Sequence, residues 1–180
     1  MLANKTIDQV ILAYPWPPLS HEANLRQLLG LVSTDDTMQD ARWVAYLLAT
    51  VRHETAFTFA PVEEYGRGTG HPYGVPDPVT GQTYYGRGYV QITWKENYKK
   101  FTDLLGVDLV NHPGLALDPT TSYRIASYGM IHGSFTGIGL GRYINAEGCD
   151  YFNARRIING LDCAKDIAVY ATAFEKSLTS

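Results

Sequence analysis

Arg52-His53-Glu54-Thr55 is the stretch that decides the fold, because it ends a helical pattern that begins near Asp36. Apolar residues recur through this pattern at the spacing of one helix face: Ala41, Val44, Ala45, Leu47, Leu48 and Val51. Glu54 follows Val51 by three positions, so its carboxyl group should lie on the apolar side of the helix. Because burial disfavours a charged carboxylate, we expect a raised pKa for Glu54 and a proton available for general acid catalysis.

Two further carboxylates follow in a long loop that runs from Phe57 to about Gly81. Hydrolases that invert a glycosidic bond need two carboxyl groups roughly 6.5–9.5 Å apart, one as acid and one as base. Glu63 and Glu64 are adjacent, so in an extended loop they point to opposite sides and only one can face Glu54. The alternative interpretation is a solvated acidic loop without a chemical role.

The segment from Tyr84 to Trp94 contains more aromatic and amide side chains than a turn requires. One interpretation is the wall of a sugar-binding cleft, with Gln91 and Thr93 forming hydrogen bonds and Tyr85 or Trp94 offering a ring face. The other is a buried strand, and both can hold because alternate residues face opposite sides. Asn159 is either a helix cap or a cleft amide, and the cap is favoured.

Composition predicts one mainly α-helical domain over residues 1–180, with the N-terminal helices in residues 1–35. Hydrophobic residues make up 45% of the chain and charged residues 18%, as in globular proteins. Expected helices include 97–105, with Tyr98, Phe101 and Leu105 facing inward, and 150–158. Residues that can start a helix are Thr6, Ser20, Asp36, Asp118 and Asp162.

Several classes of partner are not expected. The net charge of −3 gives no basic face for nucleic acid. His53-Glu54 lacks the second histidine of a zinc motif, so no metal and no cofactor are predicted. Cys149 and Cys163 are expected to be reduced and partly buried. We find no membrane span and no signal peptide, because the first apolar run stops at 15–18.

With these residues in view, the chain resembles glycoside hydrolase family 19. The resemblance rests on His53-Glu54-Thr55, on the run Tyr85-Gly86-Arg87-Gly88-Tyr89-Val90-Gln91-Ile92-Thr93-Trp94 with Asn97-Tyr98, and on 135–137 and 155–160. It covers the chain from about residue 36 to 180. The family contains plant and bacterial chitinases and phage endolysins, and implies a lysozyme-like helical fold with a small β-like segment and long cleft loops.

The resemblance implies roles for individual residues. Glu54 would be the general acid, and the general base would be Glu63 by ungapped comparison or Glu64 by its Glu-Tyr dipeptide; we favour Glu63. The substrate-binding residues would be His53, Tyr85, Arg87, Gln91, Thr93, Trp94, Asn97 and Asn159. Ala56 and Phe57 replace glycines that often follow His-Glu-Thr in the family.

The predicted function is that of an inverting hydrolase of β-1,4-linked N-acetylhexosamine polymers. Peptidoglycan is the preferred substrate, with the protein acting as a monomeric endolysin. It would be made in the host cytoplasm and reach the cell wall after release through a separate pore. A chitinase is the alternative, and a non-catalytic glycan-binding protein is the alternative of another class.

Overall fold

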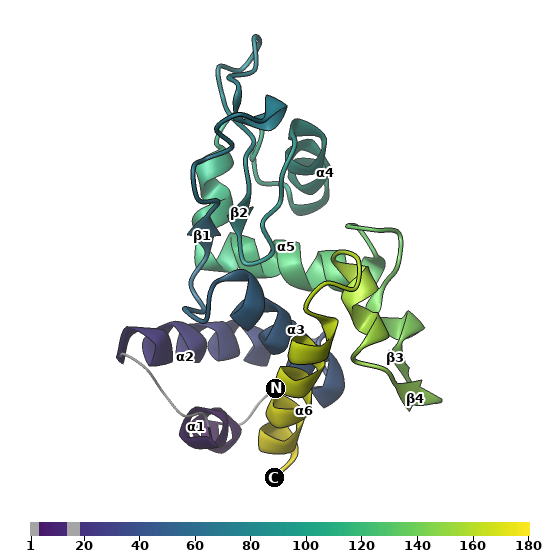
Figure 1. Cartoon of the computed structure of the whole chain (residues 1–180). Coiled ribbons are helices and arrows are strands. Elements are labelled where there is room, and N and C mark those ends of the chain that lie inside the picture. The colour runs from purple at the N-terminus through teal and green to yellow at the C-terminus, as the bar shows by residue number, and fades with distance from the viewer. Residues whose placement is uncertain (1–3, 14–18) are drawn as a thin grey trace. The chain divides into compact units, whose positions relative to one another are not determined.

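Helix α3 (Ala41–Glu54) contributes a long run of residues to the hydrophobic core. In the computed structural model, which describes residues 4–13 and 19–180, every α3 residue from Val44 to Val51 is buried. The helix packs mainly against α6 (Ala164–Thr179), and the two lie side by side in Figure 1. The sequence predicted one apolar face, but α3 is enclosed on all sides because Tyr46 and Thr50 are buried as well.

The chain forms two compact units, and each is described by itself. The first unit comprises Met1–Phe59 with Ala126–Ser180, and the second comprises Ala60–Ile125. The prediction of one domain over 1–180 stays a prediction. The prediction of a mainly α-helical protein with a small β segment is confirmed.

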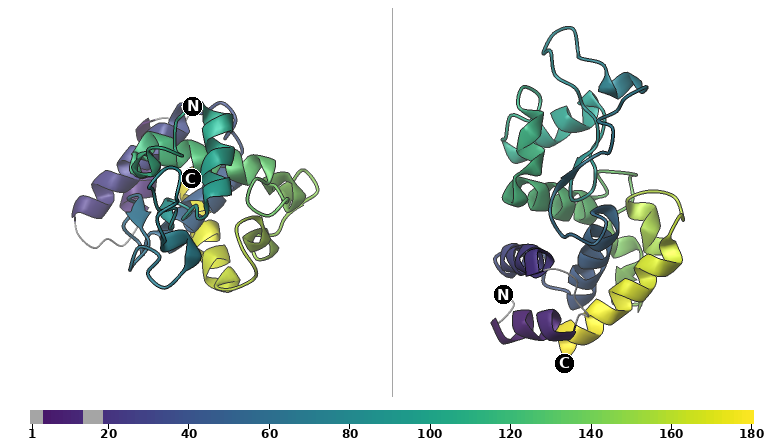
Figure 2. Two further views of the ribbon diagram at one scale, coloured as in Figure 1. Left: turned by 90° about the horizontal axis from the view of Figure 1, so that it is seen from above. Right: turned by 60° about the vertical axis from the view of Figure 1, so that its left-hand side comes forward.

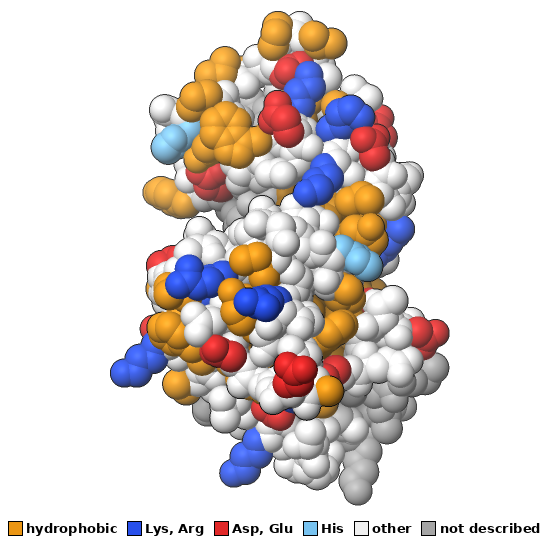
Figure 3. Space-filling model, turned by 90° about the vertical axis from the view of Figure 1, so that its right-hand side faces the viewer, with side chains coloured by type: hydrophobic (Ala, Val, Ile, Leu, Met, Phe, Trp, Pro, Cys, Tyr) orange, Lys and Arg blue, Asp and Glu red, His pale blue; other side chains and the backbone are white. Residues whose placement is uncertain are grey.

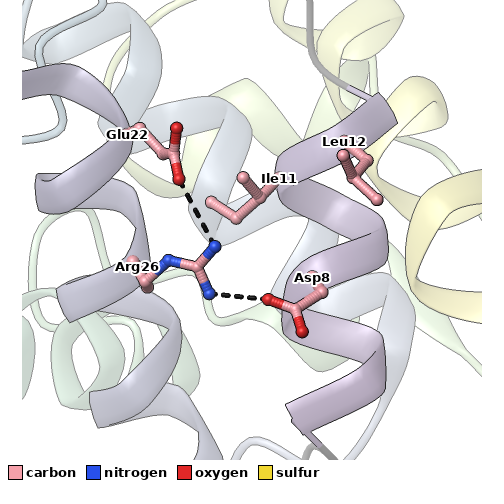
Figure 4. Close-up of a pocket in the computed structure, with 5 residues that line it drawn as sticks. All are labelled: Asp8, Ile11, Leu12, Glu22 and Arg26. Carbon is pink, nitrogen blue, oxygen red and sulfur yellow. Dashed lines mark hydrogen bonds and ion pairs between the residues drawn. The ribbon is translucent and has the colours of Figure 1, made fainter. Parts of the chain in front are cut away.

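In the first unit, α1 (Asn4–Ala13) contacts both α2 (Leu19–Ser33) and α6, and Figures 1 and 2 show α1 beside the C-terminal end of α6. Arg26 on α2 lies 2.7 Å from Asp8 on α1 and 3.3 Å from Glu22. Figure 4 shows the Arg26 guanidinium linked to both carboxylates. The unit also contains the 3-10 helices η3 (Leu140–Arg142) and η4 (Asn153–Ile157). A hairpin of β3 (Ile144–Asn145) and β4 (Gly148–Cys149) lies between them in sequence.

In the second unit, the antiparallel strands β1 (Val62–Glu63) and β2 (Arg87–Gly88) pair Glu63 with Arg87. The unit also contains η1 (Pro72–Gly74), α4 (Lys95–Leu105), η2 (Pro113–Leu117) and the first half of α5 (Pro119–His132). Tyr98 and Phe101 of α4 are buried, whereas Leu105 is only half-buried. The Tyr98 hydroxyl donates to the Tyr85 carbonyl oxygen at 2.7 Å, which ties α4 to the chain before β2.

Helix starts were predicted with mixed success. Asp118 is confirmed, since its carboxylate accepts a hydrogen bond from the Thr121 amide at 2.8 Å at the start of α5. The predicted helix start at Asp36 was wrong, because Asp40 caps α3 by accepting a hydrogen bond from the Arg42 amide. The predicted helix start at Asp162 was also wrong, because Cys163 occupies the N-cap position of α6.

The remaining differences concern the N-terminal helices and the segment 150–158. Helix α1 begins at Asn4, before Thr6, and Ser20 lies inside α2. The predicted end of the first helix at 15–18 lies outside the described residues. The segment 150–158 contains the 3-10 helix η4 in place of an α-helix.

The surface gives no sign of charge segregation on the face drawn in Figure 3, where acidic and basic side chains are interspersed. Both cysteines are free and exposed, so the prediction of partly buried thiols was wrong. No helix formed by the described part of the chain is both long and apolar enough to cross a membrane.

Candidate functional site

Glu54 is the last residue of α3, and the turn that ends the helix fixes its position. The Phe57 amide donates to the Arg52 carbonyl oxygen at 2.8 Å, and the Ala56 amide donates to the His53 carbonyl oxygen at 3.3 Å. This pair of hydrogen bonds is a Schellman motif, in which the residue after the cap adopts a left-handed conformation. Ala56 does so, with φ 48°. The side chain of Glu54 is 18% exposed, which confirms the predicted partial burial.

Arg155 is the partner of Glu54, and the sequence analysis assigned it no role. Its Nη1 donates to Oε1 of Glu54 at 2.6 Å, although 101 residues separate the two, and its side chain is only 3% exposed. Its Nη2 lies 3.4 Å from Oδ2 of Asp162. Burial opposes the charge of Arg155, but the hydrogen bond and charge of Glu54 outweigh it, so the pKa of Arg155 is raised. The sequence shows two arginines between the apolar residues Ala154 and Ile157, of which the structure buries Arg155 and exposes Arg156.

Replacing Arg155 by methionine is expected to destabilise the protein, because the Glu54 carboxylate would lose its buried partner. Breaking a buried ion pair from one side costs about 3 kcal/mol, and urea denaturation at pH 7 measures it. The double variant Glu54→Gln/Arg155→Met should lose less than the sum of the single variants, because neither charge then remains. A loss under about 0.5 kcal/mol for Arg155→Met would mean that the pair behaves like an exposed one.

Glu63 lies on β1 of the second unit, where two kinds of partner hold its carboxylate. The Tyr85 hydroxyl donates to Oε1 at 2.7 Å, and the exposed Arg67 lies 2.8 Å from Oε2. Arg87 is 3.9 Å from Oε1, and the Glu63 side chain is 30% exposed. The hydrogen bond from Tyr85 holds the pKa of Glu63 below its ordinary value of 4.5, and the charges of Arg67 and Arg87 act in the same direction. Glu63 is therefore an accessible, ionised carboxylate.

Glu64 has a different set of partners, as the alternation of an extended chain predicts. Its Oε2 accepts a hydrogen bond from the Gly86 amide at 2.9 Å, and its own amide donates to the Gly86 carbonyl oxygen at 2.7 Å. Its Oε1 accepts from the Tyr73 hydroxyl at 3.0 Å. Both carboxylate oxygens of Glu64 therefore connect loop segments of the second unit.

The predicted cleft residues Gln91, Thr93 and Asn97 lie in one chain of hydrogen bonds. Gln91 donates through Nε2 to the carbonyl oxygens of Val62 and Gly88, both at 2.8 Å. The Thr93 hydroxyl donates to the Gln91 carbonyl oxygen at 3.0 Å, and the Asn97 Nδ2 donates to the Thr93 carbonyl oxygen at 2.7 Å. The three side chains therefore stabilise the turn that follows β2. Their roles as sugar contacts stay predictions.

The aromatic residues of the predicted wall divide into a buried and an exposed group. Arg87 is 5% exposed and covers the Tyr85 ring, with 3.5 Å between its guanidinium carbon and the ring centroid. Arg87 also donates to the Tyr98 hydroxyl at 2.9 Å, so it supports Tyr85 from inside the unit. Trp94 is 47% exposed, and its ring contacts Tyr73 edge to face at 5.0 Å.

The last two predicted residues belong to the first unit. Asn159 is exposed, its amide donates to the Arg155 carbonyl oxygen at 3.0 Å, and its Oδ1 accepts from the Gly160 amide at 2.9 Å. The cap of η4 is Ile158, one residue earlier, so the prediction that Asn159 caps the helix was wrong. His53 is half-buried beside Glu54. Across residues 4–13 and 19–180 there is no group of three or more His, Cys, Asp or Glu side chains suited to a metal ion.

Asp77 organises the long loop of the second unit. Its Oδ1 accepts from the amides of Val79 at 3.0 Å and Thr80 at 2.9 Å, and its Oδ2 lies 2.7 Å from Lys95. The hydrogen bond from Lys95 and those from the two amides lower the pKa of Asp77 from 3.8 to about 2.

Replacing Asp77 by asparagine should therefore lower stability in a pH-dependent manner. A carboxyl group with a depressed pKa stabilises the folded state at pH values above its unfolded pKa, and that contribution is lost as pH falls through the folded pKa. The stability difference between the unsubstituted chain and Asp77→Asn should be constant from about pH 5 to 7 and shrink from about pH 4 to 2. Urea denaturation at each pH measures it, and a pH-independent difference would contradict the assignment.

Comparison with known proteins identifies the family and the fold of the chain. The family model described as chitinase class I, glycoside hydrolase family 19, matches residues 21–133, more than half of the chain. A basic endochitinase from Vitis vinifera is 37% identical over 112 residues, which are 54% of this chain and 36% of the relative. The chain thus matches little more than a third of that relative's length.

Two solved structures have the same fold at low identity. A bacterial family 19 chitinase superposes with a TM-score of 0.64 at 22% identity, covering 98% of this chain and 94% of that one. Chitinase C from Streptomyces griseus gives 0.65 at 21% identity, covering 99% and 77%. The fold expected from the resemblance is therefore confirmed. On the match over residues 21–133, the chain belongs to glycoside hydrolase family 19.

Proposed function

We propose that this protein is a glycosidase that hydrolyses β-1,4 bonds inside chains of N-acetylglucosamine, as in chitin. The observation that carries the proposal is the family match over residues 21–133, which includes Glu54, Glu63 and Glu64. Relatives in this family from Vitis vinifera and Persea americana are named endochitinases. These names favour the chitin alternative over the peptidoglycan substrate preferred from the sequence.

In the proposed reaction Glu54 is the general acid. The reaction starts from the protonated form of Glu54, whose proton passes to the glycosidic oxygen as the bond from that oxygen to the anomeric carbon breaks. Glu54 is left as a carboxylate, and Arg155 at 2.6 Å is placed to stabilise the negative charge that forms there. The ion pair therefore supports a role for Arg155 as a positioning residue.

Glu63 is the proposed general base. It takes one proton from a water molecule, whose oxygen attacks the anomeric carbon from the opposite face, so the product has the inverted, α configuration. Two observations favour Glu63 over Glu64. Its lowered pKa keeps it ionised, and its Oε2 pairs with Arg67, whose side chain is 71% exposed, so water can reach this side of the carboxylate. Both carboxylate oxygens of Glu64, by contrast, accept hydrogen bonds within the second unit, from the Tyr73 hydroxyl and the Gly86 amide.

The proposal is tested by incubating the protein with colloidal chitin and, separately, with purified peptidoglycan, using Glu54→Gln as the control. Release of chito-oligosaccharides by the unsubstituted chain alone supports it. Activity on peptidoglycan alone would mean that the substrate is peptidoglycan and not chitin, while the proposed mechanism would remain. If neither polymer were cleaved but chitin were bound, the glycan-binding alternative would take the place of the enzyme.

A further inference from the structure

The turn after α3 contains a bulky residue in an unusual backbone conformation. Phe57 has φ 69°, in the left-handed region that large side chains rarely adopt. The Schellman motif requires a left-handed residue at Ala56, one position earlier, and does not by itself require one at Phe57. Non-glycine residues in this region are held there at a cost and are concentrated at functional sites. The side chain of Phe57 therefore calls for an explanation.

That side chain forms an aromatic platform with two neighbours from the same unit. The Arg52 guanidinium carbon lies 5.0 Å from the Phe57 ring centroid and 3.7 Å from the Tyr170 ring centroid. The rings of Phe57 and Tyr170 meet edge to face at 6.4 Å and 74°. We call Arg52, Phe57 and Tyr170 the Phe57 platform; it spans the end of α3 and the middle of α6, which Figure 1 shows side by side.

Part of the Phe57 side chain is exposed despite these two contacts. Arg52 covers one face and Tyr170 meets an edge, yet Phe57 is 45% exposed. Phe57 follows Glu54 by three residues, in the turn that the hydrogen bond from the Phe57 amide to the Arg52 carbonyl oxygen closes. An exposed aromatic ring suits a sugar, because the C–H face of a sugar ring packs on an aromatic ring.

We propose that the Phe57 platform binds one sugar ring of a β-1,4-linked N-acetylhexosamine chain next to the bond cleaved at Glu54. This inference rests on the proposed function and deepens it, because it makes Phe57 a residue that determines affinity for the polymer. The alternative is purely structural. In a Schellman motif the residue at the position of Phe57 often contacts the residue at the position of Arg52, and that contact stabilises the helix end.

Three variants separate binding from structure. Phe57→Gly removes the ring and places at φ 69° the residue best suited to it. Phe57→Leu keeps an apolar side chain over Arg52, with the same backbone cost, but offers no ring face. Ala56→Gly is the matched control, because it relaxes a left-handed position of the same turn, with φ 48°, and leaves the platform intact.

The measurements are KM and kcat on chitohexaose, the melting temperature, and the Kd of chitohexaose for the Glu54→Gln chain alone and combined with Phe57→Gly or Phe57→Leu. Both Phe57 variants should raise KM and Kd at least about fivefold, as expected for the loss of an aromatic anchor. Phe57→Gly should melt within about 3 °C of the unsubstituted chain. Ala56→Gly should leave KM unchanged.

Two results would overturn the inference. The first is an unchanged KM and Kd in Phe57→Leu, which would reduce Phe57 to a helix-end contact. The second is a rise in KM for Ala56→Gly equal to that for Phe57→Gly, which would make the turn and not the ring responsible. Failure of the proposed function is distinguishable, because the unsubstituted chain would then cleave no chitohexaose at all, and the inference would fall with it.

Discussion

Glu54→Gln is expected to lower kcat on chitin oligosaccharides by roughly 10²–10⁴-fold, the usual contribution of a general acid. Glutamine has nearly the shape of glutamate but cannot protonate the glycosidic oxygen. The Kd for chitohexaose should change little, because the neutral amide still fits the position of the carboxyl group. Time-resolved product analysis and calorimetric titration measure the two quantities on the same preparation.

Two controls make the interpretation of Glu54→Gln specific. The exposed Glu147, in the turn of the β3–β4 hairpin, gives the matched variant Glu147→Gln, which should leave kcat unchanged. A substrate with an aryl leaving group needs less protonation, so Glu54→Gln should lose much less activity on it. Equal losses on both substrates would contradict the acid role and indicate a folding defect, which the melting temperature would reveal.

Glu63→Gln is expected to lower kcat by roughly 10²–10⁴-fold, because it removes the base that activates water. Its neighbour gives the matched comparison. Glu64→Gln should leave kcat within about fivefold, because its carbonyl oxygen can still accept from the Gly86 amide and its amide group can donate to the Tyr73 hydroxyl.

The same assignment fixes the acid side of the pH profile. Because Tyr85 and two arginines lower the pKa of Glu63, the base should remain ionised below pH 4.5, its ordinary pKa. Activity should therefore fall on the acid side only below that value, and Tyr85→Phe should shift the acid limb of kcat/KM to higher pH. The reverse pattern, with Glu64→Gln inactive and Glu63→Gln merely destabilised, would transfer the base role to Glu64.

Features set by local sequence were predicted well. The helix ending at Glu54 follows from apolar residues at helical spacing, and the start of α5 follows from a capping aspartate before a proline at the first helical position. The partial burial of Glu54 follows from the same spacing. Each of these depends on residues only a few positions apart.

Features that depend on distant contacts were not predicted. The partner of Glu54 lies 101 residues away, so no local spacing could identify Arg155. Asp162 has the character of a helix cap, but its carboxylate lies beside Arg155, and the cap position of α6 passes to Cys163. The positive φ of Phe57 was likewise hidden, because the sequence showed only that a glycine position held a phenylalanine.

The distinction between Glu63 and Glu64 lies between these two cases. Alternation along an extended chain predicts that they take different partners, and they do. Which partner each takes depends on Tyr85 and Gly86, more than 20 residues along the chain, because the β1–β2 pairing brings these residues to the loop. The sequence therefore identified Glu63 and Glu64 as the two candidates for the general base, and their hydrogen bonds favour Glu63.

The central claim, inverting hydrolysis of N-acetylglucosamine chains with Glu54 as acid, is tested most directly by the configuration of the newly formed sugar end. Proton NMR during the first minutes of chitohexaose cleavage distinguishes the α from the β anomer before the two equilibrate. We predict that the α anomer accumulates first and that Glu54→Gln abolishes its appearance. Initial accumulation of the β anomer would contradict the account, because it requires a retaining mechanism.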